Sequence, residues 1–162
     1  SCRVMHRDIK PENILMSHDY NSVHLGDFGF KKQMDESLAN TVLGSFGFLA
    51  PEVASMQQYS WKADIYSLGC VMYEMVTLEL GVNHNFQAIS SGEAYFRSVE
   101  GKMDGAYGNG ALSQLIVSML RIAPQDRPTA SEVVSRLKSI LLEHLAQNDN
   151  APRSPATPSE AK

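Results

Sequence analysis

The chain has 162 residues, which suits one globular domain, and its hydrophobic content of 43% is ordinary for a soluble protein. Its formal net charge of −4 gives no electrostatic basis for binding nucleic acid or an anionic membrane, because both favour basic surfaces. The longest apolar run, residues 65–80, is interrupted by Glu74 and Glu79 and is too short to span a bilayer.

Two cysteines, Cys2 and Cys70, are too few for a disulfide framework. Cys70 lies in an apolar run, where a buried, reduced thiol is expected, so a reducing compartment fits the composition. The chain starts at Ser1 rather than at a methionine, which suggests a fragment or a partial gene model.

A polar stretch near the start of the chain carries the strongest chemical signal. It reads His6-Arg7-Asp8-Ile9-Lys10-Pro11-Glu12-Asn13 and combines a carboxylate, an ammonium and a carboxamide, a set suited to a phosphate, a metal ion and a hydroxyl nucleophile. A simpler interpretation is a polar loop whose Asp and Asn bind backbone N–H groups. The stretch matches the pattern H-R-D-L-x-x-x-N, with Ile9 in place of Leu, and by it the chain resembles the protein kinases.

The resemblance implies a role for each polar residue of this loop. Asp8 would accept the proton of a substrate hydroxyl, Lys10 would steady the transferred phosphoryl group, and Asn13 would hold a magnesium ion. Lys10 followed by Pro11 and Glu12 resembles the serine/threonine branch. ATP and Mg²⁺ would then be the cofactors, and proteins would be the substrates.

Two short apolar runs, residues 14–16 and 23–25, flank Asx and Ser residues that favour a turn, so a small hairpin is predicted after the loop. It leads into Asp27-Phe28-Gly29, which matches D-F-G. By resemblance Asp27 would chelate the magnesium ion together with Asn13. The alternative is that Asp27 is only a turn residue before Gly29.

Residues 30–49 are polar and irregular and are followed by Ala50-Pro51-Glu52, which matches A-P-E. This pattern indicates an activation segment. In the family, a phosphate on this segment pairs with the Arg of H-R-D, here Arg7. Thr41 matches the phosphorylation site of NIMA-related kinases, and an upstream activating kinase would then be a partner. The alternative is an unmodified, solvated Thr41. Ser45 would supply the hydroxyl that bridges Asp8 and Lys10.

The residues just before Ala50 depart from the family pattern at Gly47. Gly47 loosens the wall that would meet the substrate residue following the phosphoacceptor, so peptide specificity is in doubt.

Downstream, residues 65–76 are apolar around most of a helix, which predicts a buried helix. By resemblance Asp64 would hold the backbone of the H-R-D loop. Val71 and Met75 would support Leu15 under the adenine of ATP, although ordinary core packing explains them equally well.

The rest of the chain predicts further helices. Residues 78–88 read as a loop, residues 88–99 as a helix, and residues 101–110, with four glycines, as a flexible connection. His84 has no ligand partner at metal-binding spacing. A helical face follows, made of Leu112, Leu115, Ile116, Met119 and Leu120.

A D-R-P motif contains Arg127, which in kinases forms a buried ion pair with the Glu of A-P-E, here Glu52. The alternative is a surface Arg near a turn. Thr129 is predicted to cap a last helix, with Glu132 at the reciprocal position.

These observations predict a mainly α fold, similar to the large C-terminal lobe of a protein kinase, with a small β-hairpin beside the catalytic loop. Residues 1–145 would be a partial catalytic domain and residues 146–162 a disordered tail. The sequence contains neither G-x-G-x-x-G nor the V-A-I-K lysine, so the N-terminal lobe is expected to be absent and this fragment alone to be inactive. The predicted function is a serine/threonine protein kinase with an intracellular, cytoplasmic location. The alternative is a kinase-derived binding or scaffold fragment that works without catalysis.

Overall fold

The computed structural model describes residues 5–26, 47–56, 60–79, 91–107 and 110–149. Asp27, Thr41, Ser45 and His84 therefore lie outside the described residues, as do residues 150–162 of the predicted tail. The elements in chain order are η1 (Pro11–Asn13), β1 (Ile14–Met16), β2 (Val23–Leu25), α2 (Pro51–Ala54), α3 (Lys62–Thr77), α5 (Glu93–Tyr107), α6 (Ala111–Met119), η3 (Pro124–Asp126) and α7 (Ala130–Asp149).

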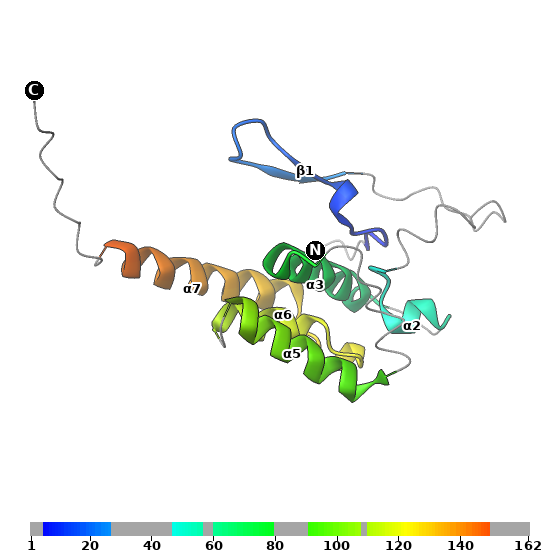
Figure 1. Ribbon diagram of the computed structural model, residues 1–162. Helices are drawn as coiled ribbons and strands as arrows, with labels where there is room; N and C mark the ends of the chain where they lie inside the picture. The colour runs from blue at the N-terminus through cyan, green and yellow to red at the C-terminus, as the bar shows by residue number, and fades with distance from the viewer. Residues whose placement is uncertain (1–4, 27–46, 57–59, 80–90, 108–109, 150–162) are drawn as a thin grey trace, which may run out of the picture.

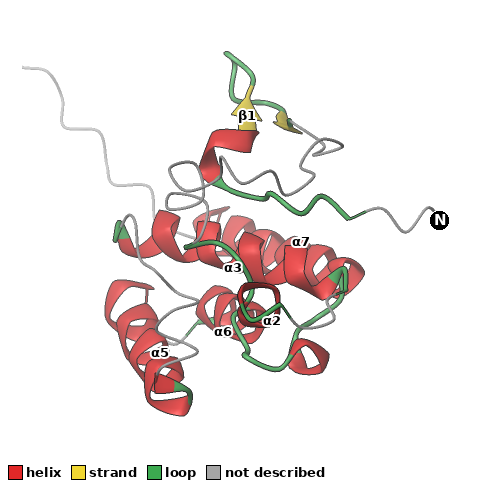
Figure 2. Cartoon of the chain, turned by 90° about the vertical axis from the view of Figure 1, so that its right-hand side faces the viewer, coloured by secondary structure: helices red, strands yellow, loops and turns green. Residues whose placement is uncertain are grey.

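The described chain is mostly helical and has one two-stranded antiparallel sheet, which confirms the predicted mainly α class with a hairpin. Figures 1 and 2 both show this hairpin standing apart from a body of packed helices. No helix in the described part of the chain combines the length and the apolar character that crossing a bilayer requires.

The hairpin forms where its turn residues predict it. Ile14 pairs with Leu25 and Met16 with Val23, so the strands are in antiparallel register. In the turn, the Asp19 carboxylate accepts a hydrogen bond from the Ser17 hydroxyl at 2.6 Å and one from the Asn21 side chain at 2.9 Å. The Ser17 bond, followed by the Asn21 bonds, lowers the pKa of Asp19 to about 2, because these bonds favour the ionised carboxylate.

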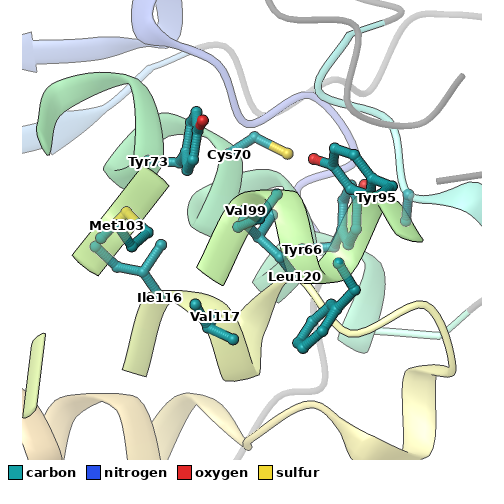
Figure 3. Close-up of a cluster of buried hydrophobic side chains, with 11 residues drawn as sticks. Tyr66, Cys70, Tyr73, Tyr95, Val99, Met103, Ile116, Val117 and Leu120 are labelled. Atoms are coloured by element: carbon teal, nitrogen blue, oxygen red, sulfur yellow. The ribbon is translucent and has the colours of Figure 1, made fainter. Parts of the chain in front are cut away.

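Helix α3 is the centre of the helical body, as its apolar circumference predicts. Tyr66, Cys70 and Tyr73 of α3 are almost fully buried. They pack against Tyr95, Val99 and Met103 of α5 and against Ile116, Val117 and Leu120 of α6 and its C-cap (Figure 3). Helix α6 approaches so closely at Gly69 that a Cβ there would lie 2.9 Å from the Met119 Cβ. Cys70 is a free, buried cysteine, which confirms the sequence prediction.

The prediction of a flexible connection at residues 101–110 is wrong over most of that range. Helix α5 runs from Glu93 to Tyr107 and passes straight through Gly101. A glycine inside a helix costs only about 1 kcal/mol relative to alanine. Val99 and Met103 lie on one side of the helix and are 2% and 0% exposed. Burying two such side chains stabilises the helix by about 3 kcal/mol or more, which outweighs that cost.

The last helix begins with the predicted reciprocal cap. The backbone N–H of Thr129 donates to Glu132 Oε2 at 2.6 Å, and the N–H of Glu132 donates to Thr129 Oγ1 at 3.2 Å. These bonds satisfy backbone donors that the first helical turn leaves without intrahelical partners. Val133 then anchors α7 in a small core with Ile65, Leu115 and Met119.

Candidate active site

Three polar side chains of the predicted catalytic loop lie together. Asn13 Nδ2 donates to the backbone carbonyl of Asp8 at 2.7 Å and to Asp8 Oδ2 at 3.0 Å. Lys10 Nζ lies 3.1 Å from the same Oδ2. Pro11 starts a single 3₁₀ turn, closed by the Asn13 N–H donating to the Lys10 carbonyl at 3.0 Å. This short turn brings Asn13 back over Asp8, so local geometry forms the cluster.

The orientation of Asn13 suits a hard cation. Its side-chain nitrogen makes both bonds to Asp8, so Oδ1 is the amide atom that remains to ligate a metal. Among the described residues, no group of three or more His, Cys, Asp or Glu could hold a metal ion. Asn13 Oδ1 is an oxygen ligand of the kind that magnesium takes, often with only one or two such ligands from protein. The second proposed ligand, Asp27, lies outside the described residues.

Asp64, in the first turn of α3, holds the backbone of the loop. Its Oδ2 accepts from the His6 N–H at 2.7 Å, and its Oδ1 accepts from the Arg7 N–H at 2.9 Å. Arg7 has φ of 69°, a left-handed conformation that non-glycine residues rarely adopt. Two charge-assisted hydrogen bonds to one carboxylate stabilise this unusual backbone.

The loop is also fixed on its other side. His6 is buried, and its Nε2 lies 2.8 Å from the carbonyl oxygen of Gly26, the residue that precedes Asp27. This bond links the catalytic loop to the end of β2. This contact is not among the sequence predictions, although the position of His6 inside the motif and of Gly26 beside D-F-G could have suggested it.

The predicted phosphate pairing of Arg7 stays a prediction. The Arg7 side chain is exposed, and its predicted phosphate partner Thr41 lies outside the described residues. The predicted support of Leu15 by Val71 and Met75 stays a prediction. Val71 is buried at 4% exposure, but Leu15 and Met75 are 56% and 69% exposed.

Glu52 of α2 and Arg127 form a buried, two-pronged ion pair. Arg127 Nη1 lies 2.7 Å from Glu52 Oε1 and Nη2 lies 2.8 Å from Oε2, and the Arg127 side chain is fully buried. The carbonyls of Arg121, Lys62 and Ile122 accept the remaining guanidinium hydrogen bonds. The alternative of a surface Arg therefore does not hold, because every donor group of this side chain is engaged inside the body.

Sequence analysis also missed Ser67. Its hydroxyl donates to the carbonyl of Phe48 at 2.7 Å, and the carbonyl of Ala63, one turn earlier in α3, lies 3.2 Å away. A hydroxyl inside an otherwise apolar helical turn was the available signal. The bond fastens the end of the predicted activation segment, just before α2, to the same helix that carries Asp64.

Comparison with known proteins adds an independent line of evidence. A model of the protein kinase domain family matches residues 1–137. The chain is 38% identical over 135 residues to serine/threonine-protein kinase Nek6 of Oryza sativa subsp. japonica, which covers 82% of this chain and 24% of that protein. It is 34% identical over 138 residues to serine/threonine-protein kinase Nek5 of Mus musculus, covering 83% and 21% of the two. With G2-specific protein kinase nim-1 of Neurospora crassa it shares 35% identity over 136 residues, covering 82% and 15%. The chain thus spans a quarter or less of the length of these relatives.

Proposed function

The chain belongs to the protein kinase family, with Nek serine/threonine kinases among its homologues, and we propose that it is the part of a serine/threonine kinase that receives the protein substrate. The observation that carries this proposal is the cluster of Asp8, Lys10 and Asn13, held to α3 through Asp64. It supplies a proton acceptor, a cation and an amide oxygen within one loop.

In the proposed reaction, the oxygen of a substrate serine or threonine attacks the γ-phosphorus of ATP. The new O–P bond forms as the bond to the ADP oxygen breaks, and the Asp8 carboxylate accepts the proton of the attacking hydroxyl. The Lys10 ammonium donates hydrogen bonds to the phosphoryl oxygens as charge shifts among them. Magnesium, when held by Asn13 and Asp27, would neutralise charge on the ATP phosphates.

The remaining predicted residues take supporting roles in this proposal. Leu15 would lie against the adenine, Ser45 would bridge Asp8 and Lys10, and phosphorylation of Thr41 by an upstream kinase would order the activation segment through Arg7. We further propose that residues 1–145 are the C-terminal part of the catalytic domain of an intracellular protein. Glu52 and Arg127 would act as scaffold for that part.

The test is phosphate transfer by the full-length protein and by its Asp8→Asn variant, with ATP, Mg²⁺ and a serine/threonine peptide library. Losing a general base lowers turnover by about 10²- to 10⁴-fold, so Asp8→Asn should be close to inactive. Asp104→Asn, the same chemical change on the exposed side of α5, should keep wild-type activity. Equal phosphate transfer by Asp8→Asn and by the wild type would contradict the role assigned to Asp8. A folded wild-type protein without any transfer would favour the non-catalytic binding alternative.

A further inference from the structure

Residues 47–50, the wall segment, lie at the end of the predicted activation segment, just before α2. Ala50 is 1% exposed and Phe48 packs partly buried against the main core, so this wall segment lies on the helical body. In the proposed function, which this inference deepens, it faces the substrate residue that follows the phosphoacceptor. Its position would therefore influence which peptides are accepted.

One side chain of α3 fixes the backbone of the wall segment. Ser67 is buried at 9% exposure, and its hydroxyl proton can serve one acceptor fully at a time. The Phe48 carbonyl is nearer than the Ala63 carbonyl, at 2.7 Å against 3.2 Å. The shorter bond links two parts of the chain that are 19 residues apart in sequence. Ser67 thus joins α3 to the peptide unit of Phe48 through a hydrogen bond.

The two ends of the wall segment differ in how they are held. Downstream, the N–H groups of Val53 and Ala54 donate to the Ala50 carbonyl, and Glu52 is fixed by Arg127. Upstream, Gly47 has no side chain with which to anchor the segment. A glycine also leaves the backbone free to adopt many conformations. The bond from Ser67 therefore acts on the residue that follows the glycine of the segment.

Ser67 also shares a helical face with the tether of the catalytic loop. Asp64 and Ser67 are three residues apart in α3, a spacing that places side chains as neighbours on one side of a helix. Asp64 binds the backbone of His6 and Arg7, beside Asp8, while Ser67 binds the backbone of Phe48. One turn of a buried helix thus sets the position of the wall segment relative to the catalytic loop.

We propose that Ser67 is a positioning residue for substrate recognition, which holds the wall segment through the Phe48 carbonyl and so sets the preference for the residue after the phosphoacceptor. Ser67 does not touch the reacting atoms. Removing its hydroxyl should raise the KM for peptide and weaken discrimination at that residue. The KM for ATP should not change, because the Ser67 hydroxyl is bonded to the Phe48 and Ala63 carbonyls rather than to Lys10 or Asn13.

The experiment compares two peptides in the full-length protein, with leucine or aspartate after the phosphoacceptor. In Ser67→Ala, the ratio of the two kcat/KM values should move toward one by roughly 3- to 10-fold, the range expected for the loss of one hydrogen bond. Ser67→Thr keeps a hydroxyl and should restore the wild-type ratio. Ser118→Ala is the matched control, because it removes a 2.7 Å hydroxyl-to-carbonyl bond that stays within one helical turn of α6. It should leave the ratio unchanged.

Ser67→Cys, with a similar volume and a much weaker donor, replaces Ser67→Ala if that variant does not fold; it should shift the ratio in the same direction. Thermal melting of all variants identifies any general loss of structure. An active wild type whose ratio is the same in Ser67→Ala, Ser67→Cys and Ser118→Ala overturns the role of Ser67 but leaves the proposed function intact. A wild type whose phosphate transfer is not reduced by Asp8→Asn overturns the proposed function itself.

Discussion

The segment with the proposed catalytic residues (residues 5–26, the catalytic segment) and the helical body around α3 are held in place by different forces. In the catalytic segment, Leu15, Met16 and Val23 are each more than half exposed, and its links to the body include the hydrogen bonds from His6 and Arg7 to Asp64. In the body, α3, α5 and α6 bury a continuous apolar cluster. Directional bonds thus position the proposed catalytic groups, while apolar burial supplies the stability. Substitutions in the body, in the catalytic segment or at the link between them should therefore have different effects.

The largest effect should come from the ion pair inside the body. Arg127→Ala leaves Glu52 charged and buried without its partner, which typically costs about 3–5 kcal/mol in the free energy of unfolding. Lys102→Ala is the matched control, since Lys102 and Glu79 also approach to 2.7 Å but are 47% and 42% exposed. That exposed pair should contribute less than about 1 kcal/mol. Thermal unfolding of the full-length protein measures both, and similar small losses would show that the Arg127 pair is not part of the core.

Breaking the link between the two regions should have a smaller and more local effect. In Asp64→Asn, the amide keeps only one acceptor oxygen for the N–H groups of His6 and Arg7, so one charge-assisted bond worth about 1.5–3 kcal/mol is lost. Hydrogen exchange should accelerate in residues 5–26 while the amides of α3 and α6 remain protected. Equal acceleration in both regions would mean that the catalytic segment and the body unfold as one unit.

The close contact at Gly69 tests packing within the body alone. A methyl group in Gly69→Ala would lie 2.9 Å from the Met119 Cβ, an atom near the backbone that cannot move aside cheaply. Such overpacking costs about 1–3 kcal/mol, which exceeds or cancels the gain of up to 1 kcal/mol in helix propensity. Gly101→Ala meets no atom within 4 Å and should therefore stabilise α5. A higher melting temperature for Gly69→Ala than for Gly101→Ala would contradict the close approach of α3 and α6.

The smallest effect should be the acid dependence of the hairpin turn. The pKa of Asp19 falls from its ordinary value of 3.8 to about 2, first because of the Ser17 hydroxyl. A carboxylate with a lowered folded pKa stabilises the fold above its unfolded pKa, and this contribution disappears as the pH falls from about 4 to about 2. An NMR titration of the Asp19 carboxyl should give the low value, and Ser17→Ala should raise it. A pKa near 3.8 in the wild type would contradict the hydrogen bonds from Ser17 and Asn21 to Asp19.

The sequence predicted well what local chemistry determines. The β1 and β2 strands and the Thr129 cap follow from turn and capping residues a few positions apart. The pairing of Glu52 with Arg127, which are 75 residues apart, could be predicted only from a family motif.

The features that the sequence did not predict depend on the tertiary arrangement. Helix α5 continues through Gly101 because burial outweighs propensity, which no local pattern reveals. The exposure of Met75 and the partner of Ser67 depend on which elements lie beside each face of α3. An apolar periodicity identifies a helix but does not identify its neighbours.

Cys70 lies in the middle of the body, with no exposed surface, and its burial raises the pKa of its thiol well above the ordinary value of 9.0. Only a thiolate in contact with solvent reacts with an alkylating reagent, so Cys70 is protected as long as α3 stays packed. The labelling rate of the peptide containing Cys70, followed by mass spectrometry, therefore measures how often the body opens and is insensitive to movement of the catalytic segment. A residue with no part in the proposed reaction thus serves as an internal reporter of the stability on which the reactive loop depends.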